Sequence, residues 1–151
     1  PFVTELFDED GETLGRVGKE FGTVTGRARR CGWLDVVMLR YAVRLNSLTE
    51  LSLTKLDILD GFETVKICTG YSYRGEEITE YPDRYDVLEE IEPVYIELPG
   101  WGTALTEKRE PSHLPQEAQD FIRVVEEHVG IPVRVVGVGA ERDDYLVWGS
   151  E

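Results

Sequence analysis

Two stretches of the chain carry apolar residues at helical spacing. In the first stretch the apolar positions recur every three or four residues, at Leu34, Val37, Met38, Tyr41, Ala42 and Leu45. This spacing places them on one face of a helix, which should end near Asn46. In the second stretch the same spacing joins Ala118, Phe121, Ile122, Val125, Glu126 and Val129. Pro115 suits the first position of this second helix, and Gly130 suits its C-terminal cap.

Short segments rich in β-branched and aromatic residues lie outside these two helices. They predict strands at 51–53, 64–71, 77–81, 94–98, 133–136 and 145–148, with a hairpin through the turn at 74–76. An acidic helix is expected at about 83–91, an exposed turn at 8–12, and irregular segments at 20–30 and 101–112. Alternating strands and helices predict an α/β fold with a mixed, partly parallel sheet flanked by helices. We expect residues 1–151 to form one domain, because their number is typical of a single domain and the sequence shows no internal repeat, low-complexity tract or second domain.

The composition is that of a soluble globular protein. Of the 151 residues, 41% are hydrophobic and 30% are charged, and no apolar run approaches the ~20 residues that a membrane-spanning helix needs. Cys31 and Cys68 have neither a metal-binding spacing nor the density of a disulfide scaffold, so a cytoplasmic location is expected. Because Pro1 stands where an initiator methionine is expected and no leader follows it, we expect the chain to be cut from a longer one.

The net charge of −14 argues against a nucleic-acid or anionic-membrane surface, because such surfaces attract clustered positive charge. The basic residues are unevenly distributed along the chain. Five of the 16 basic residues lie from Arg16 to Arg30, where Glu20 is the only acid. A local cationic loop in an acidic protein indicates a small anionic ligand.

Residues 23–30 read Thr-Val-Thr-Gly-Arg-Ala-Arg-Arg and are the first candidate binding segment. Threonine hydroxyls and loop amides can donate to carboxylate or phosphate oxygens, and arginines supply forked, permanently charged donors. Gly26 lets the backbone come close to a ligand. From composition alone, an exposed basic turn before a helix explains the segment equally well.

The second candidate is Lys55-Leu56-Asp57, after the expected strand at 51–53. Ligands of open α/β sheets gather at the carboxyl ends of strands. The Asp57 carboxylate can accept from N1–H and the exocyclic amine of guanine, whereas adenine presents an acceptor at N1. The methylene stem of Lys55 can lie over the purine ring. Lys-x-Asp is a common triplet, however, and without context a solvated surface is the simpler interpretation.

The third candidate is Gly137-Val138-Gly139, after the expected strand at 133–136. Glycines there let backbone amides and carbonyls approach a ligand, although a plain strand-ending turn needs no ligand. The segment is not the dinucleotide fingerprint, because Arg142 stands where a third glycine is needed.

Motifs for chemistry are absent from the sequence. It contains no Gly-x-x-x-x-Gly-Lys phosphate loop, no Gly-x-Ser-x-Gly elbow and no cluster of His and Cys for a metal. His113, His128 and the paired acids at 89–90 and 126–127 are most simply solvated or structural. We therefore assign no catalytic residue and no metal ligand to this chain.

These motifs occur in a fixed order along essentially the whole chain. Glu-Phe-Gly at 20–22 precedes Thr-x-Thr-Gly-Arg-x-Arg-Arg-Cys-Gly-Trp-Leu-Asp at 23–35, Leu-Arg-Tyr-Ala-Val-Arg-Leu-Asn at 39–46 and Leu-Thr-Lys-Leu-Asp-Ile-Leu-Asp-Gly at 53–61. Pro-Val-Tyr at 93–95, Leu-Pro-Gly-Trp at 98–101 and Val-Gly-Val-Gly at 136–139 complete the series. In this order the motifs resemble adenylosuccinate synthetase.

The resemblance implies a larger, P-loop-NTPase-like α/β enzyme, of which this chain is the C-terminal part. Family members join IMP and L-aspartate at the expense of GTP, with Mg²⁺, by phosphorylating O6 of IMP before the aspartate nitrogen displaces the phosphate. Their phosphate loop, catalytic aspartate and histidine, and magnesium ligands are expected in the N-terminal remainder. The isolated chain is thus expected to be inactive, and the complete enzyme to be a homodimer.

The resemblance also assigns roles to the candidate residues. The loop for aspartate and IMP would comprise Thr23, Val24, Thr25, Gly26, Arg27, Ala28 and Arg29. Arg27 would also reach the IMP ribose, and Arg29 would approach the GTP phosphates. The guanine base of GTP would be enclosed by Lys55, Leu56, Asp57, Gly137, Val138 and Gly139.

Three positions depart from the family pattern. Val24 replaces a second threonine and removes one hydroxyl donor, which is expected to weaken aspartate binding. Ala28 replaces a common proline or arginine, and Gly137 replaces a usual serine. The alternative to a part of a ligase is a free-standing module that binds a guanine nucleotide or another small anion without catalysis.

Overall fold

The computed structural model describes residues 2–149 of the chain. Its contacts divide these residues into two compact units, and each unit combines two separate segments of the chain. Unit 1 comprises residues 2–38 and 66–96, and unit 2 comprises residues 39–65 and 97–149.

Unit 1 is built around strand β3 (Thr64–Tyr73), whose first two residues belong to unit 2. The other elements are α1 (Glu9–Val17), β1 (Leu34–Asp35), β4 (Glu76–Ile78), α3 (Tyr85–Leu88) and the first part of β5 (Glu92–Pro99). β1 pairs in parallel with β3, β4 pairs with β3 as an antiparallel hairpin, and β5 also pairs with β3. Val37, Cys68 and Tyr71 form the centre of the core, where the Tyr71 hydroxyl donates to Asp35 Oδ2 at 2.5 Å.

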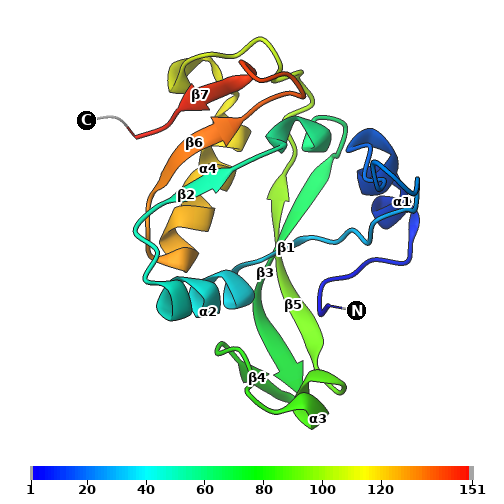
Figure 1. The fold of residues 1–151 in the computed structure, drawn as a ribbon. Helices are drawn as coiled ribbons and strands as arrows, with labels where there is room; N and C mark the ends of the chain where they lie inside the picture. The colour runs from blue at the N-terminus through cyan, green and yellow to red at the C-terminus, as the bar shows by residue number, and fades with distance from the viewer. Residues whose placement is uncertain (1, 150–151) are drawn as a thin grey trace. The chain divides into compact units, whose positions relative to one another are not determined.

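Unit 2 contains a three-stranded sheet in the order β2-β6-β7. Its elements are most of α2 (Val36–Asn46), β2 (Leu51–Leu53), the 3-10 helices η1 (Leu56–Leu59) and η2 (Pro111–His113), α4 (Gln116–Val129), β6 (Val133–Gly137) and β7 (Tyr145–Val147). β2 and β6 are parallel, and β7 is antiparallel to β6. α4 lies against this sheet (Figure 1), with Glu126 Oε1 accepting from the Val133 amide at 2.8 Å and Arg123 over the ring of Trp148.

The expected α/β class with mixed strand pairing is confirmed. The two helices with clear periodicity are present as α2 and α4, and α4 ends at Gly130, whose φ of 85° is the left-handed cap conformation that favours glycine. Pro115 is the N-terminal cap of α4 rather than its first helical residue. The predicted hairpin is present as β3 and β4, joined through Arg74 and Gly75.

The prediction of an exposed turn at 8–12 is wrong, because these residues begin helix α1. The Asp8 carboxylate caps the helix by accepting from the Gly11 amide at 3.1 Å. Glu9, Asp10 and Glu12 lie in its first turn, where the helix dipole favours acidic side chains. The acidic helix expected at 83–91 is also shorter than predicted, since α3 spans only Tyr85–Leu88. Over residues 2–149, no helix has the length and apolar character to cross a membrane.

Candidate functional site

The parallel strands β2 and β6 of unit 2 bring two of the candidate segments together. Leu53 lies opposite Val136, so both strands end at the same edge of the sheet, one leading into Lys55 and the other into the turn at 137–139. The missing side chain of Gly137 allows this approach, because a Cβ there would lie 3.2 Å from Thr54 Cα and 3.3 Å from the Lys55 nitrogen. The sheet edge therefore places the Lys55 to Asp57 segment beside the glycine turn.

Asp57 lies at this edge with one buried carboxylate oxygen and a raised carboxyl pKa. Its Oδ1 atom is buried and has no hydrogen-bond partner among the described residues. Burial raises the pKa of the Asp57 carboxyl above its ordinary value, and the nearby charges of Asp60 and Asp144 add to this rise, while a backbone hydrogen bond at Asp57 and the charge of Lys55 act against it. A carboxylate in this state is stabilised by a ligand that brings hydrogen-bond donors.

Two residues assigned to the guanine site turn their side chains away from it. The side chains of Leu56 and Val138 belong to the core, with exposed fractions of 2% and 0%. Only their backbone groups remain for contact with a ligand. Lys55 is exposed and has a left-handed φ of 60°, which turns the chain from β2 into η1.

Asp60 is a further residue of this region that the sequence reasoning missed. Its Oδ1 accepts from the indole nitrogen of Trp101 at 2.7 Å, and its Oδ2 accepts from the Leu105 amide at 3.1 Å. These two bonds tie the residue after η1 to the segment after β5, three residues along the chain from Asp57. A sequence signal exists, because a buried Trp N–H usually has a partner, but spacing alone does not indicate which acid provides it.

Replacing Asp57 by asparagine is expected to stabilise the ligand-free chain by up to about 1 kcal/mol near pH 7, since the negative charge of a partly buried carboxylate is removed from the neighbourhood of Asp60 and Asp144. Because the folded-state pKa of Asp57 is raised, the folded state binds its proton more tightly than the unfolded state. The wild type therefore loses stability as the pH rises from the ordinary pKa of 3.8 through the raised value. Denaturant unfolding of both proteins from acid to neutral pH measures the difference. An advantage of the variant that does not shrink toward acid pH would contradict this assignment.

The arginine loop of unit 1 forms a tight hairpin. Phe21 and Ala28 form an antiparallel bridge, and the Gly22 amide donates to the Arg27 carbonyl at 2.8 Å. The Gly26 amide donates back to the Gly22 carbonyl at 2.8 Å, and the φ of 64° at Gly26 explains the glycine there. The loop residues Thr23, Val24, Thr25, Gly26, Arg27, Ala28, Arg29 and Arg30 are all exposed.

The three arginines of this loop differ in their partners. Arg29 Nη1 lies 3.0 Å from Glu20 Oε2, and Arg30 Nε lies 3.6 Å from Glu5 Oε1. Within residues 2–149, Arg27 forms no ion pair, and its guanidinium is therefore available to an anion. Of the three, Arg27 is the arginine that the structure leaves ready for a ligand.

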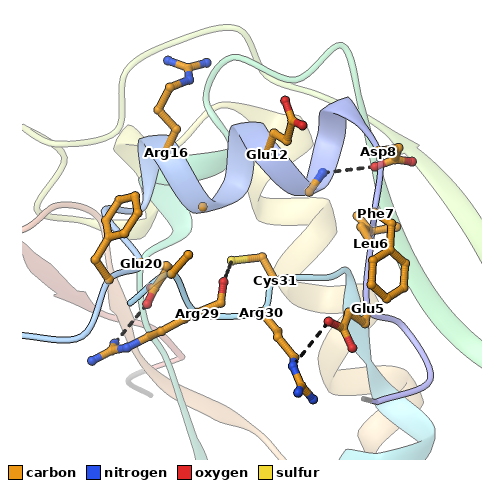
Figure 2. Close-up of a pocket in the computed structure, with 14 residues that line it drawn as sticks. Glu5, Leu6, Phe7, Asp8, Glu12, Arg16, Glu20, Arg29, Arg30 and Cys31 are labelled. Atoms are coloured by element: carbon orange, nitrogen blue, oxygen red, sulfur yellow. Dashed lines mark hydrogen bonds and ion pairs between the residues drawn. The ribbon is translucent and has the colours of Figure 1, made fainter. Parts of the chain in front are cut away.

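An open pocket of about 670 Å³ lies between helix α1 and the base of this loop (Figure 2). Arg29 and Arg30 border it from the loop, and Glu5 and Glu20 hold these two side chains in the ion pairs drawn in Figure 2. Arg16 comes from α1 and points away from the loop. The loop and the sheet edge of Asp57 belong to different units. Among the residues with described positions, no three His, Cys, Asp or Glu side chains gather as a metal site would require.

Comparison with known proteins identifies the family. The profile described as adenylosuccinate synthetase matches residues 1–146. The chain belongs to the adenylosuccinate synthetase family. The adenylosuccinate synthetase of Geotalea daltonii is 50% identical over 147 residues, which cover 97% of this chain and 34% of that protein. The enzyme of Parabacteroides distasonis is 48% identical over 151 residues, covering 100% of this chain and 35% of its own length.

A solved structure shows the same fold. The adenylosuccinate synthetase from Plasmodium falciparum, described as fully ligated, superimposes with a TM-score of 0.94 at 38% sequence identity. The match covers 99% of this chain and 36% of that one. The chain thus spans about a third of the length of the adenylosuccinate synthetases that it matches. The resemblance read from the ordered motifs is confirmed, whereas the roles of the individual site residues stay predictions.

Proposed function

We propose that this chain is the C-terminal part of an adenylosuccinate synthetase, in which it reads the guanine base of GTP and binds L-aspartate and IMP through its arginine loop. The complete enzyme would join IMP and aspartate to adenylosuccinate and release GDP and phosphate. Membership of the family supports this proposal, and the chemistry of both candidate sites agrees with it. A cytoplasmic homodimer is proposed for the complete enzyme by the same analogy.

The observation that carries the proposal is the buried, unpaired Oδ1 of Asp57. Guanine offers two adjacent donors, N1–H and the exocyclic amine, which a carboxylate can accept together. Adenine would place the lone pair of its N1 against the same carboxylate, so its binding would leave Asp57 unsatisfied. The sheet edge that carries Asp57 would therefore bind GTP in preference to ATP. The backbone of residues 137–139 would lie on the other side of the base.

The arginine loop would supply the anion contacts. Arg27 would form forked hydrogen bonds to the aspartate carboxylate and reach the IMP ribose. Arg29 would exchange Glu20 for a GTP phosphate oxygen, and this exchange is easy because a solvent-exposed ion pair contributes only about 0–1 kcal/mol. Val24 is 96% exposed, so its isopropyl group contributes no packing that would offset the hydroxyl it replaces.

The chemical step would depend on groups outside this chain. The family implies Mg²⁺, which would neutralise charge on the GTP phosphates when bound. In the part of the chain that the structure describes, no group of acidic or histidine side chains fits such an ion. We therefore assign to these residues the binding and orientation of the substrates, and to the N-terminal remainder the phosphate loop, the metal ligands and the proton transfer.

The complete enzyme containing this segment is expected to form adenylosuccinate from IMP, aspartate and Mg²⁺ with GTP, and far more slowly with ATP. The 151-residue chain by itself is expected to form none. Product formation by both proteins, with either nucleotide, tests this. Turnover by the isolated chain, or equal rates with ATP, would contradict the proposal. Binding of GTP without turnover by the complete protein would instead favour a non-catalytic guanine-nucleotide module.

A further inference from the structure

Asp144 is a buried acid just beyond the glycine turn, and all of its polar groups are engaged. The residue is 9% exposed. Its Oδ1 accepts from Arg109 Nη2 at 2.9 Å, and its Oδ2 accepts from the Glu141 amide at 3.0 Å. Its carbonyl accepts from the Val138 amide at 2.8 Å, and its own amide donates to the Glu141 carbonyl at 3.1 Å. This one residue thereby closes the loop at 138–144.

The side chain of Asp144 also explains the second glycine of the turn. A Cβ on Gly139 would collide with the Asp144 carboxyl group, lying 2.7 Å from its Cγ. The carboxyl group thus packs directly on the backbone of Gly139. On the other side of the turn, Gly137 packs on the backbone of Thr54 and Lys55. The turn is therefore held between Asp144 and the segment that leads to Asp57.

Arg109 holds Oδ1 of the Asp144 carboxyl group. Besides its bond to Asp144, its Nη1 donates to the carbonyls of Thr106 and Lys108 at 2.6 and 2.9 Å. The guanidinium is thus held by three contacts, and it balances the charge of a buried carboxylate that would otherwise keep the bond to the Glu141 amide but lose its ion pair. The charge of Asp144 also contributes to the raised pKa of Asp57, which places the two carboxylates within electrostatic reach of each other.

We propose that Asp144, held by Arg109, is a positioning residue for guanine: it sets the backbone of residues 137–139 at the distance from Asp57 that a purine base requires. The proposal rests on the assignment of the guanine site in the proposed function. Asp144 itself does not touch the base. Its loss would let the turn move and so weaken the binding of GTP, while leaving the arginine loop for aspartate and IMP as it is.

The test is steady-state kinetics of the complete enzyme with Asp144→Ala, and with Asp143→Ala as the matched control, because Asp143 is exposed. Asp144→Ala is expected to raise KM for GTP about tenfold to a hundredfold, since a misplacement of about 1 Å costs that much. KM for IMP and aspartate should stay within about twofold, and Asp143→Ala should change none of the three. If the alanine variant does not fold, Asp144→Asn, which keeps the shape but loses the charge, decides by the same comparison.

Arg109→Met supplies a second readout. Arg109→Met alone removes the ion pair of the buried Asp144 carboxylate and should raise KM for GTP. In the double variant with Asp144→Asn, KM for GTP should rise by less than the two single changes predict together. An unchanged KM for GTP, or an equal rise of KM for all three substrates together with a lower Tm, would overturn the proposal and leave Asp144 a general stabiliser. Asp57→Asn, measured in parallel, tests the guanine site separately from the positioning role of Asp144. If Asp57→Asn changes the preference for GTP over other nucleotides while Asp144→Ala leaves KM for GTP unchanged, the guanine site is retained and only the positioning role of Asp144 is wrong.

Discussion

In the complete enzyme, Asp57→Asn is expected to lower kcat/KM for GTP roughly tenfold to over a hundredfold. The amide keeps one acceptor oxygen but turns a donor toward the second donor of guanine, so one guanine hydrogen loses its partner. The loss of such a bond to a charged group costs on the order of 1.5–3 kcal/mol.

The same variant should gain activity with xanthosine triphosphate relative to GTP. Xanthine has a carbonyl where guanine has its amine, and the asparagine amide matches it with one acceptor and one donor. The measurement is kcat/KM for both nucleotides at saturating IMP and aspartate. Asp120→Asn is the control, since it changes an exposed carboxylate of helix α4. A nucleotide ratio equal to that of the wild type would remove Asp57 from base recognition.

Arg27→Ala is expected to raise KM for aspartate or IMP and to lower kcat, with a combined loss of about tenfold to a hundredfold in kcat/KM. Truncation removes a charge-assisted fork from a bound anion, which costs roughly 1.5–3 kcal/mol. Arg27 has no ion pair within residues 2–149, so the loss reflects the ligand and not a broken internal contact. KM for GTP should change less.

Two further variants sharpen the test of Arg27. Arg27→Lys keeps the charge but not the planar fork, and its activity should lie between those of the wild type and Arg27→Ala. Arg16→Ala removes an equal charge from helix α1, where the side chain points away from the loop (Figure 2), and should have little effect. If Arg16→Ala and Arg27→Ala reduce activity equally, the effect is one of net charge and Arg27 is not a ligand-binding residue.

The sequence predicted those elements of the fold that depend on residues close together in the chain. Helices α2 and α4 follow from apolar residues at a spacing of three and four, and Gly130 marks the end of α4. The same periodicity does not predict burial, since Leu45 on α2 is 65% exposed. Helix α1 was missed because its acidic first turn resembles a loop, although Asp8 followed by acids is also the pattern of a helix N-terminus.

At the turn of residues 137–139, the sequence alone did not reveal why the two glycines are required. From the sequence, the two glycines were explained either by the approach of a ligand or by a plain strand-ending turn. In the structure, Gly137 is needed against the backbone of Thr54 and Lys55, and Gly139 is needed against Asp144. Both glycines thus serve the packing of the protein itself, and that packing places the turn beside Asp57.

The sequence by itself determined the family, the helices with strong periodicity and the residue types able to bind guanine and small anions. Those features depend on the order and spacing of nearby residues. Only the tertiary structure decided that β2 and β6 are parallel neighbours, that Oδ1 of Asp57 is buried without a partner among the described residues, and that Asp60 and Asp144 bond to the segments near it. The reason is that these contacts join residues far apart in the chain, where burial and hydrogen bonding depend on the packed fold and not on local spacing.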